Sequence, residues 1–419
     1  MNARRTLMLL VPGSWLAAAF AACGGGDPTP AIDVGSDAAR SPAPEGGNLP
    51  RPADGSIDAG DAAVGLDAAL EPPCARSTVD AGRSDECLAR LDLVGKKLPY
   101  YRSHALDSPH PAIERLVVIQ HGSNRNAWDH YDVVSAAARV RDPARTAVVA
   151  PLFQAYNTVC GQDAKEPDDL YWGCSDWKEG REAKNAATDS FVALDALIVA
   201  AKAAFPGLKR VTVAGYSAGG QTVQRYAAGN LEHDRTPSIA TRYVVSSPGS
   251  YMYLDGRRVH PSATCTGAAS CTLDPGSFVV PTYAPDGCVT TDGALDPDDP
   301  DDAYDDYRYG LRNRKGYLAG VADAHIVAKY PARSVVYVLS DGDSRSGAGT
   351  AYSVLDRGCP AMVQAPVDAS FRLQRGLVFH RYMTLLFGAS HRMVVVPVCA
   401  HDEACVLSAP ATQEEIFGP

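Results

Sequence analysis

A serine stands in a glycine-rich motif directly after an apolar run of the chain. The run RVTVA over 210–214 is followed by GYSAG over 215–219, a G-x-S-x-G pattern. The residues after the motif can continue as a helix, so Ser217 would occupy a tight turn between a strand and a helix. Without side chains at Gly215 and Gly219, the backbone can pack closely around that turn. The motif predicts Ser217 as a nucleophile; the alternative is a glycine-rich turn that holds a bystander serine.

A nucleophilic serine needs a base, and one of the ten histidines is well placed for that role. His401 lies in a short loop after the apolar run MVVVPV over 393–398, close to the chain end. His380 falls within a predicted helix over 371–387, and His391 precedes the last apolar run instead of following it. Six further histidines do not follow an apolar run that could be a core strand: His104, His110, His130, His233, His260 and His325. We therefore expect His401 to be the base.

A second motif lies at the end of another apolar run. RLVVIQ over 115–120 leads into His121-Gly122 and then Ser123. Together with the G-x-S-x-G motif, this pair makes the chain resemble the α/β-hydrolase superfamily of serine hydrolases. The resemblance implies that the backbone N–H groups of Ser123 and Ala218 form the oxyanion hole, which binds the tetrahedral intermediate. His121 itself is expected to shape the loop and not to transfer protons.

The same resemblance points to the acid, because nucleophile, acid and base follow one another along the chain in this superfamily. The run VVYVL over 335–339 is followed by SDGD over 340–343. The superfamily usually has a glycine, two variable residues and the acid at this place; a serine replaces the glycine here, which makes Asp343 the match. Asp341 is the alternative, and either carboxylate could instead cap the loop. The mechanism that these residues imply needs neither a metal nor an organic cofactor.

Short apolar runs alternate with helical patterns along the central and C-terminal parts of the chain. Over 189–205, large apolar residues recur every three or four positions, which predicts a helix that ends at Pro206-Gly207. Further helices are predicted over 218–228 and 371–387. Such alternation is typical of a parallel sheet with helices on both faces, where ligands bind at the carboxyl ends of the strands. We predict an α/β-hydrolase fold with strands over 115–120, 146–150, 210–214, 243–246, 335–339 and 393–398.

The chain has 11 cysteines, which is many for a cytosolic enzyme and indicates an oxidising compartment. None of the pairs has C-x-x-C spacing, which disfavours zinc ribbons and thioredoxin-like sites. Ten of the cysteines can form five disulfides. Short loops favour the pairs Cys74–Cys87, Cys160–Cys174 and Cys399–Cys405, the last of which would brace the loop of His401. We expect the other four to pair among themselves: Cys265, Cys271, Cys288 and Cys359.

The N-terminal 22 residues have the layout of a signal peptide. Two arginines precede an apolar run over 7–22, which is too short for a comfortable membrane span. The run ends in FAAC over 20–23, and small residues before a cysteine resemble a bacterial lipobox. The resemblance implies that Cys23 is acylated and anchors the protein to a membrane, which also explains the odd cysteine. The alternative is ordinary signal cleavage near Ala22.

The segment 24–73 is rich in Ala, Gly, Pro and Asp and contains no aromatic residue. It cannot bury enough apolar surface to fold, so we expect residues 23–73 to be a lipid-anchored, disordered tether before a catalytic domain over 74–419. The chain carries 39 basic and 49 acidic side chains, a formal net charge of −10. This balance argues against a nucleic-acid partner, because nucleic-acid binding needs excess positive charge.

Two insertions are expected within the catalytic domain. The first, about 153–180, carries Tyr171, Trp172 and Trp177, which either line a substrate subsite or pack around the Cys160–Cys174 bridge. The second, about 247–333, lies between the sixth and seventh strands, where many hydrolases of this superfamily carry a cap.

Two features of the second insertion stand out. The residues YRYGL over 307–311 resemble a motif in a poorly characterised group of secreted α/β-hydrolases. The acidic run over 296–306 contains prolines and lacks a ligand-loop glycine, so we expect a solvated loop in preference to a calcium site.

These features together predict an extracytoplasmic serine hydrolase that cleaves small or polymeric carboxylic esters through an acyl-enzyme. One alternative is a peptidase or amidase that uses the same residues. Another is a non-catalytic surface binding protein on the same fold. The presence of Ser217, Asp343 and His401 together argues against the last, because non-catalytic relatives usually lose at least one of the three.

Overall fold

The computed structural model describes residues 74, 86–157, 160–162, 166–266, 270–281, 304–347, 349–366 and 370–418. The predicted signal segment, Cys23, the tether and Cys288 all lie outside these residues. Among the helices that are described, none combines the length and the apolar character needed to span a bilayer.

The central element is an eight-stranded sheet in the order β1-β2-β4-β3-β8-β9-β14-β15. Its first two strands run antiparallel to their neighbours, and the pairs from β4 to β15 are all parallel. In chain order this is 1-2-4-3-5-6-7-8, so the chain has the α/β-hydrolase fold predicted above. The strands are β1 (Leu88–Leu93), β2 (Lys96–Arg102), β3 (Arg115–Gln120), β4 (Thr146–Pro151), β8 (Arg210–Tyr216), β9 (Ala240–Ser246), β14 (Ser334–Ser340) and β15 (Arg392–Val396).

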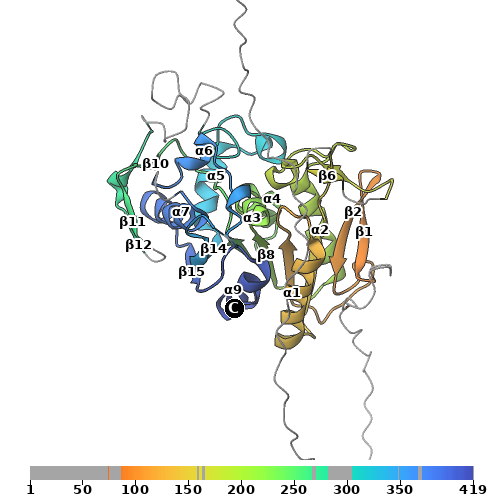
Figure 1. Cartoon of the computed structure of the whole chain (residues 1–419). Coiled ribbons are helices and arrows are strands. Elements are labelled where there is room, and N and C mark those ends of the chain that lie inside the picture. The colour runs from red at the N-terminus through yellow and green to blue at the C-terminus, as the bar shows by residue number, and fades with distance from the viewer. Residues whose placement is uncertain are drawn as a thin grey trace, which may run out of the picture. The chain divides into compact units, whose positions relative to one another are not determined.

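Helices cover both faces of the sheet (Figure 1). On one face α1 (Ala127–Arg141), α8 (Glu403–Ser408) and α9 (Pro410–Phe417) share an apolar core with the strands. On the other face the core is formed with α2 (Ser190–Ala204), α3 (Ala218–Gly229) and α7 (Arg372–Phe387). The shorter helices are α4 (Leu231–Arg235), α5 (Asp323–Lys329) and α6 (Cys359–Met362).

The parallel strands are buried on both faces, which explains why they are continuous apolar runs. In β3, Leu116 and Val118 belong to the core that contains α2 and α3, whereas Val117 and Ile119 belong to the core that contains α1. Every strand predicted from these runs is confirmed, with ends shifted by at most three residues. The predicted helices over 189–205, 218–228 and 371–387 are confirmed as α2, α3 and α7.

The hairpin of β1 and β2 does not follow from such patterns. Its residues are only partly buried in β1, so no continuous apolar run marks the strand. Its two-residue turn has Val94 at φ 48° and Gly95 at φ 75°. A left-handed valine is rare, because a β-branched side chain is strained there, so the usual Asn-Gly turn signal is missing.

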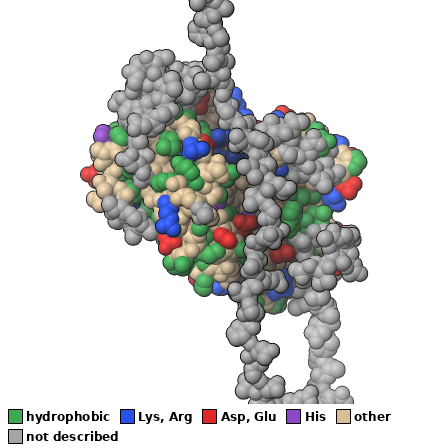
Figure 2. All heavy atoms as spheres, viewed as in Figure 1, with side chains coloured by type: hydrophobic (Ala, Val, Ile, Leu, Met, Phe, Trp, Pro, Cys, Tyr) green, Lys and Arg blue, Asp and Glu red, His purple; other side chains and the backbone are tan. Residues whose placement is uncertain are grey.

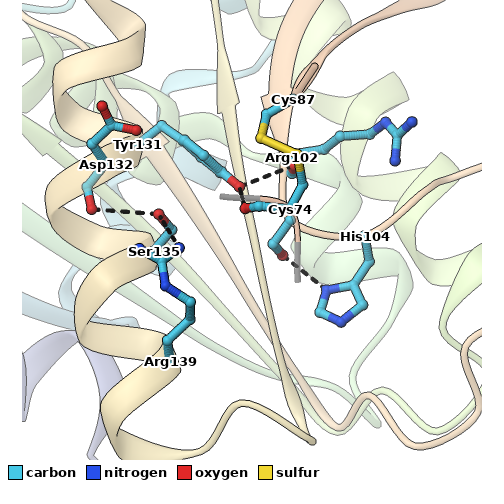
Figure 3. Close-up of a disulfide and its surroundings, with 9 residues drawn as sticks. Cys74, Cys87, Arg102, His104, Tyr131, Asp132, Ser135 and Arg139 are labelled. Atoms are coloured by element: carbon cyan, nitrogen blue, oxygen red, sulfur yellow. Dashed lines mark hydrogen bonds between the residues drawn. A yellow bond between two sulfur atoms is a disulfide. The ribbon is translucent and has the colours of Figure 1, made fainter. Parts of the chain in front are cut away.

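A disulfide fastens the start of the described chain to the sheet and to α1 (Figure 3). Cys74 and Cys87 are bonded as predicted. The Tyr131 hydroxyl of α1 donates to the Cys74 carbonyl at 2.6 Å and lies 3.0 Å from the Arg102 carbonyl of β2. These bonds join Cys74, the first described residue, to β2 and to α1.

Three further disulfides are described. The predicted pairs Cys160–Cys174 and Cys399–Cys405 are confirmed. Cys265 pairs with Cys271 across the hairpin of β11 (Thr264–Thr266) and β12 (Ser270–Thr272). Cys359 is also disulfide-bonded.

The first insertion forms a small sheet in the order β6-β5-β7, made of β5 (Gln154–Asn157), β6 (Gly161–Gln162) and β7 (Tyr171–Trp172). Trp172 and Trp177 are buried and pack against Phe153, with ring centroids 4.9 and 6.2 Å apart. The two tryptophans are therefore core residues, which supports the packing interpretation of this segment. Tyr171 is half-buried and lies 5.5 Å from the exposed Tyr156 ring.

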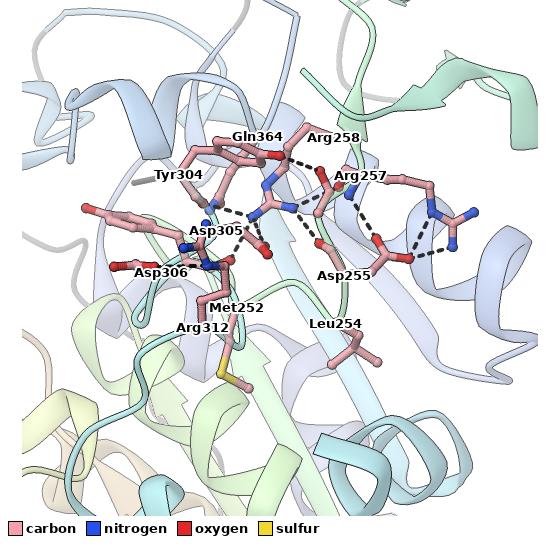
Figure 4. A network of polar contacts seen from close by, with 12 residues as sticks. Met252, Leu254, Asp255, Arg257, Arg258, Tyr304, Asp305, Asp306, Arg312 and Gln364 are labelled. Carbon is pink, nitrogen blue, oxygen red and sulfur yellow. Dashed lines mark hydrogen bonds and ion pairs between the residues drawn. The ribbon is translucent and has the colours of Figure 1, made fainter. Parts of the chain in front are cut away.

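The second insertion does lie between the sixth and seventh strands of the sheet, β9 and β14. It contains a short pair of strands, β10 (Arg258–Val259) and β13 (Phe278–Val279). Figure 4 shows its polar network, in which buried Arg258 donates to the carbonyls of Asp255 at 2.8 Å and Tyr304 at 2.9 Å. Arg258 also pairs with the Asp305 carboxylate at 3.1 Å. This buried cation joins the described residues near 255 to those that begin at 304.

The end of the acidic run differs from the expected solvated loop. Asp305 is engaged by Arg258, and Asp306 lies 3.8 Å from Arg312 and accepts from Asn313 at 2.8 Å. Residues 296–303 lie outside the described residues. For Asp305 and Asp306 the prediction of a solvated loop is wrong, because buried and half-buried arginines of the insertion pair with them.

We expect His391, buried at the start of β15, to make the fold less stable as the pH falls below 6.5. Its Nε2 lies 3.0 Å from the Tyr330 carbonyl, which can only accept, so Nε2 carries the proton. Its Nδ1 then accepts from the Tyr337 hydroxyl at 3.0 Å, which fits a neutral ring. Burial lowers the pKa of His391 to about 4 from the ordinary value of 6.5.

Because the unfolded chain binds this proton first, the stability present above pH 6.5 is lost as the pH falls through the folded pKa. The loss is about 3 kcal/mol at most. His391→Gln keeps one donor and one acceptor and should make the free energy of unfolding less dependent on pH. Urea unfolding at pH 7 and pH 4 measures this, and equal losses in variant and wild type would contradict the prediction.

Candidate active site

Ser217 is the single residue that connects β8 to α3. Its backbone has φ 56° and ψ −115°, a strained conformation for a residue with a side chain. Its N–H donates to the Ser246 carbonyl at the end of β9, 2.9 Å away. The turn thus projects Ser217 at the carboxyl end of the sheet, where the sequence pattern placed it.

The glycines of the motif are required by close backbone contacts. A Cβ at position 215 would lie 2.4 Å from the Gly219 carbonyl oxygen. A Cβ at position 219 would lie 2.3 Å from the Gln120 carbonyl oxygen of β3. Both approaches are too short for any side chain, so Gly215 and Gly219 allow β8, α3 and the end of β3 to meet at the turn.

Three side chains from distant parts of the chain meet at this turn. His401 Nε2 lies 2.9 Å from Ser217 Oγ, and His401 Nδ1 lies 2.7 Å from Asp343 Oδ2. Because Asp343 can only accept when ionised, Nδ1 carries the proton and Nε2 faces the serine hydroxyl. The arrangement is a hydrogen-bonded line of hydroxyl, imidazole and carboxylate, which can transfer the serine proton to the imidazole.

The loop of His401 is fixed at two places. The His401 N–H donates to the Gly349 carbonyl at 2.8 Å. The Cys399–Cys405 disulfide joins the start of the loop to α8. The Tyr216 ring packs beside the imidazole, with centroids 5.0 Å apart. These contacts limit the rotation of the imidazole between its two partners.

Asp343 lies in the one-turn 3₁₀ helix that follows β14, and its side chain is buried. Its second carboxylate oxygen accepts from Arg372 at 3.2 Å, and this guanidinium is equally buried. Arg372 also donates to the Thr350 carbonyl at 2.8 Å and the Ala351 carbonyl at 3.2 Å. A buried carboxylate needs such a partner, so Arg372 both pairs its charge and fixes its orientation.

Arg372 was missed by the analysis of motifs. It is the first residue of α7, where the positive end of the helix dipole disfavours a cation. A basic residue at the first position of a helix is the available signal. The partner cannot be read from the signal, because Asp343 lies 29 residues earlier in the chain.

The other candidates for acid and base lie elsewhere. Asp341 is half-buried and makes no contact with His401 among the described hydrogen bonds. His380 of α7 hydrogen-bonds through Nε2 to the His391 carbonyl at 2.9 Å. His391 binds Tyr330 and Tyr337 as described above. The structure therefore brings Asp343 and His401 to Ser217, and not these three.

The residues of the two expected oxyanion donors adjoin Ser217, one along the chain and one in the loop after β3. Ala218 begins α3, so its N–H has no acceptor within the helix. A Cβ at Gly122 would lie 3.7 Å from Ser217 Cβ, which puts the loop after β3 beside the serine. Ser123 follows directly in that loop and is exposed. Both residues therefore lie next to the turn that carries Ser217.

His121 links this loop to the segment that follows β4 by hydrogen bonds. Its Nε2 accepts from the Phe153 N–H at 3.0 Å, and its Nδ1 lies 2.8 Å from the Gly122 carbonyl. Burial lowers the pKa of His121 to about 3, so the ring stays neutral at physiological pH. Its Trp177 neighbour lies 4.7 Å away, between ring centroids. These contacts fit the expectation that His121 shapes the loop.

The chain is similar in structure to several solved hydrolases. One is poly(aspartic acid) hydrolase-1 from Sphingomonas sp. KT-1. The match spans 79% of this chain and 97% of that hydrolase, with 17% sequence identity and a TM-score of 0.49. The chain covers 84% of a poly(3-hydroxybutyrate) depolymerase, LpqC from Bordetella parapertussis, over 76% of its own length, with 17% identity and a TM-score of 0.46.

Est1E from Butyrivibrio proteoclasticus is a third such structure, with 15% identity and a TM-score of 0.35 over 78% of this chain and 97% of that one. No family model matches the chain, and no curated protein is similar to it at a significant level. Identities this low do not carry a substrate from one protein to another. The strand order and the site described above establish the fold independently of these likenesses.

Proposed function

We propose that this protein is an extracytoplasmic serine hydrolase that cleaves carboxylic esters through an acyl-enzyme on Ser217. The observation that carries the proposal is the hydrogen-bonded line from Ser217 Oγ through His401 to Asp343, with distances of 2.9 and 2.7 Å. The three side chains come from three separate strand ends, and Ser217 lies in a strained turn. Strain and convergence of this kind are typical of functional sites.

In the first half-reaction, His401 Nε2 takes the proton of Ser217 as its Oγ attacks the acyl carbon. Asp343 keeps the ring oriented through Nδ1–H and stabilises the imidazolium that forms. The negative charge on the former carbonyl oxygen is stabilised by the N–H groups of Ser123 and Ala218. When the intermediate collapses, the C–O bond to the alcohol breaks and His401 gives its proton to the departing oxygen.

In the second half-reaction, water attacks the acyl-enzyme, and His401 takes a proton from this water. Collapse of the second intermediate breaks the bond to Ser217 Oγ, and the proton returns to the serine. Arg372 contributes as a positioning residue, since it touches only Asp343 within this group. Atoms and protons balance without any further reactant, and the products are a carboxylic acid and an alcohol.

The proposed location rests on two features. Four disulfides among the described residues suit an oxidising compartment, and the 22 N-terminal residues have the layout of a signal peptide. We include in the proposal that Cys23 is the lipid anchor and that residues 24–73 are the tether to the domain. Metabolic labelling with a fatty-acid analogue tests this, and a Cys23→Ala variant that still incorporates the label would contradict it.

Comparison of ester and peptide substrates tests the reaction class. We expect the purified protein to hydrolyse 4-nitrophenyl butyrate, because the site offers an activated hydroxyl and two oxyanion donors. A panel of chromogenic peptides should be hydrolysed far more slowly. Turnover of peptides without turnover of esters would contradict the proposal and favour a peptidase with the same residues.

A further inference from the structure

Near the nucleophile, cationic side chains outnumber carboxylates. On the face seen in Figure 2, Lys and Arg side chains are interspersed with Asp and Glu side chains. Positive side chains are in excess over negative ones where the 3₁₀ turn Asp176–Glu179, α3 and α7 approach the segment that follows Tyr304. We call the residues there the cationic cluster: Lys178, Arg225, Arg308 and Arg375, with the carboxylates of Glu179 and Asp356.

Both carboxylates of the cluster are already engaged. Arg308 donates to Glu179 at 2.9 Å and to Asp356 at 3.1 Å. Glu179 also pairs with Arg181 at 2.8 Å, and Asp356 accepts from the Tyr309 hydroxyl at 2.5 Å. Their charges are therefore offset by Arg308 and Arg181. In the described part of the chain, neither carboxylate hydrogen-bonds to another cation of the cluster.

Within the described ranges, Arg225 and Arg375 donate to neutral groups only. Arg225 binds the Lys178 carbonyl at 3.1 Å and the Gln221 Oε1 atom at 3.2 Å. Arg375 binds the Gly249 carbonyl at 2.5 Å and the Ser370 hydroxyl at 3.0 Å. Burial lowers the pKa of Arg375 to about 10, which reflects the cost of a cation without a paired anion.

The Lys178 ammonium has neither a hydrogen bond nor an ion pair in the part of the chain that the structure describes. The residue as a whole is half-buried. Burial and the neighbouring Arg308 lower the pKa of Lys178 to about 8. A bound anion would offset the repulsion among these cations, so the cluster suits a negatively charged ligand.

The cluster lies beside the nucleophile. The Gln221 N–H donates to the Ser217 carbonyl at 3.1 Å, and the Gln221 side chain accepts from Arg225. On the other side, Trp177 precedes Lys178 and packs against His121, 4.7 Å between ring centroids. Ser217, Lys178, Arg308 and Asp356 are all half-buried and reach solvent. The turn that carries Lys178 therefore adjoins the loop beside Ser217.

We propose that the cationic cluster is a substrate subsite for a carboxylate, with the Lys178 ammonium as its direct contact. The preferred substrate is then an ester that carries a second, ionised carboxyl group on its acyl chain. This inference rests on the proposed ester hydrolase function and names its substrate class. The acyl carbon lies at Ser217, and the free carboxylate lies at Lys178.

Two aryl esters with acyl chains of equal length test the subsite: mono-4-nitrophenyl adipate, which is anionic, and 4-nitrophenyl hexanoate, which is neutral. We expect the wild-type kcat/KM to be at least about tenfold higher for the adipate ester than for the hexanoate ester. A charge-assisted hydrogen bond to the free carboxylate stabilises binding by about this factor. In Lys178→Met this ratio should fall about tenfold, whereas Lys178→Arg should retain most of it. Lys209→Met is the matched control: Lys209 precedes the opposite end of β8 and is exposed, so its ratio should equal that of wild type.

Inhibition adds a second measurement. Free adipate should inhibit hexanoate hydrolysis competitively in wild type, and its inhibition constant should rise about tenfold in Lys178→Met. A wild-type ratio near one, or a preference that survives Lys178→Met unchanged, would overturn the subsite while hexanoate turnover still supports the hydrolase. If wild type cleaves neither ester, the proposed function fails, and the subsite fails with it.

Discussion

Replacing Ser217 by alanine is expected to abolish ester hydrolysis, with kcat lower by about 10⁴–10⁶. The hydroxyl is the group whose oxygen attacks the acyl carbon, and its 2.9 Å contact with His401 Nε2 provides the path for its proton. Steady-state assays with 4-nitrophenyl butyrate measure the loss. The alanine side chain fits where the serine stood, so circular dichroism and thermal unfolding should resemble wild type.

Ser246→Ala is the matched control for this experiment. Ser246 ends β9 beside the turn, and its hydroxyl has no hydrogen-bond partner among the described residues. Its carbonyl accepts from the Ser217 N–H, and substitution of the side chain keeps that carbonyl. Its activity should stay within about threefold of wild type. A folded Ser217→Ala protein with wild-type activity would mean that the assigned nucleophile is wrong.

Asp343→Asn is expected to lower kcat by about 10⁴, because an amide favours the wrong tautomer of its partner histidine. With the amide in place, the proton of His401 moves from Nδ1 to Nε2, and Nε2 can no longer accept from Ser217. The variant should also be less stable by about 3 kcal/mol, since Arg372 loses the charge that pairs with its buried guanidinium. Urea unfolding measures the second effect independently of the first.

Asp341→Asn provides the matched control two residues away. Asp341 is half-buried, and no described hydrogen bond joins it to His401. We expect its activity and its free energy of unfolding to stay near those of wild type. If Asp341→Asn loses more activity than Asp343→Asn, the carboxylates have been assigned in the wrong order, and the 2.7 Å contact has no catalytic role.

The sequence predicts most of the fold because the parallel strands are buried on both faces. Continuous apolar runs such as RLVVIQ and VVYVL mark β3 and β14 closely. The meeting of Ser217, Asp343 and His401 was also predictable, since each follows a strand end at one edge of the sheet. In each case local patterns carry the information, and the parallel topology supplies the proximity.

What could not be predicted depends on contacts between distant segments. No local pattern around Arg372 indicates that Asp343 is its partner. The turn between β1 and β2 has Val94 in place of the usual turn residues, so the sequence does not predict it. The pairing of Arg258 with Asp305 and the meeting of Lys178 with Arg308 likewise arise from packing of the insertions. Such contacts follow no period along the chain, so sequence patterns carry no signal of them.

Labelling with a fluorophosphonate probe tests the central claim most directly. The probe phosphonylates an activated serine, and mass spectrometry of the digested protein locates the adduct. We predict a single adduct on the peptide that contains Ser217, formed in step with the loss of esterase activity and slowed strongly in His401→Ala. Inhibited protein with its adduct on another residue, or esterase activity that persists after full labelling of Ser217, would contradict the account.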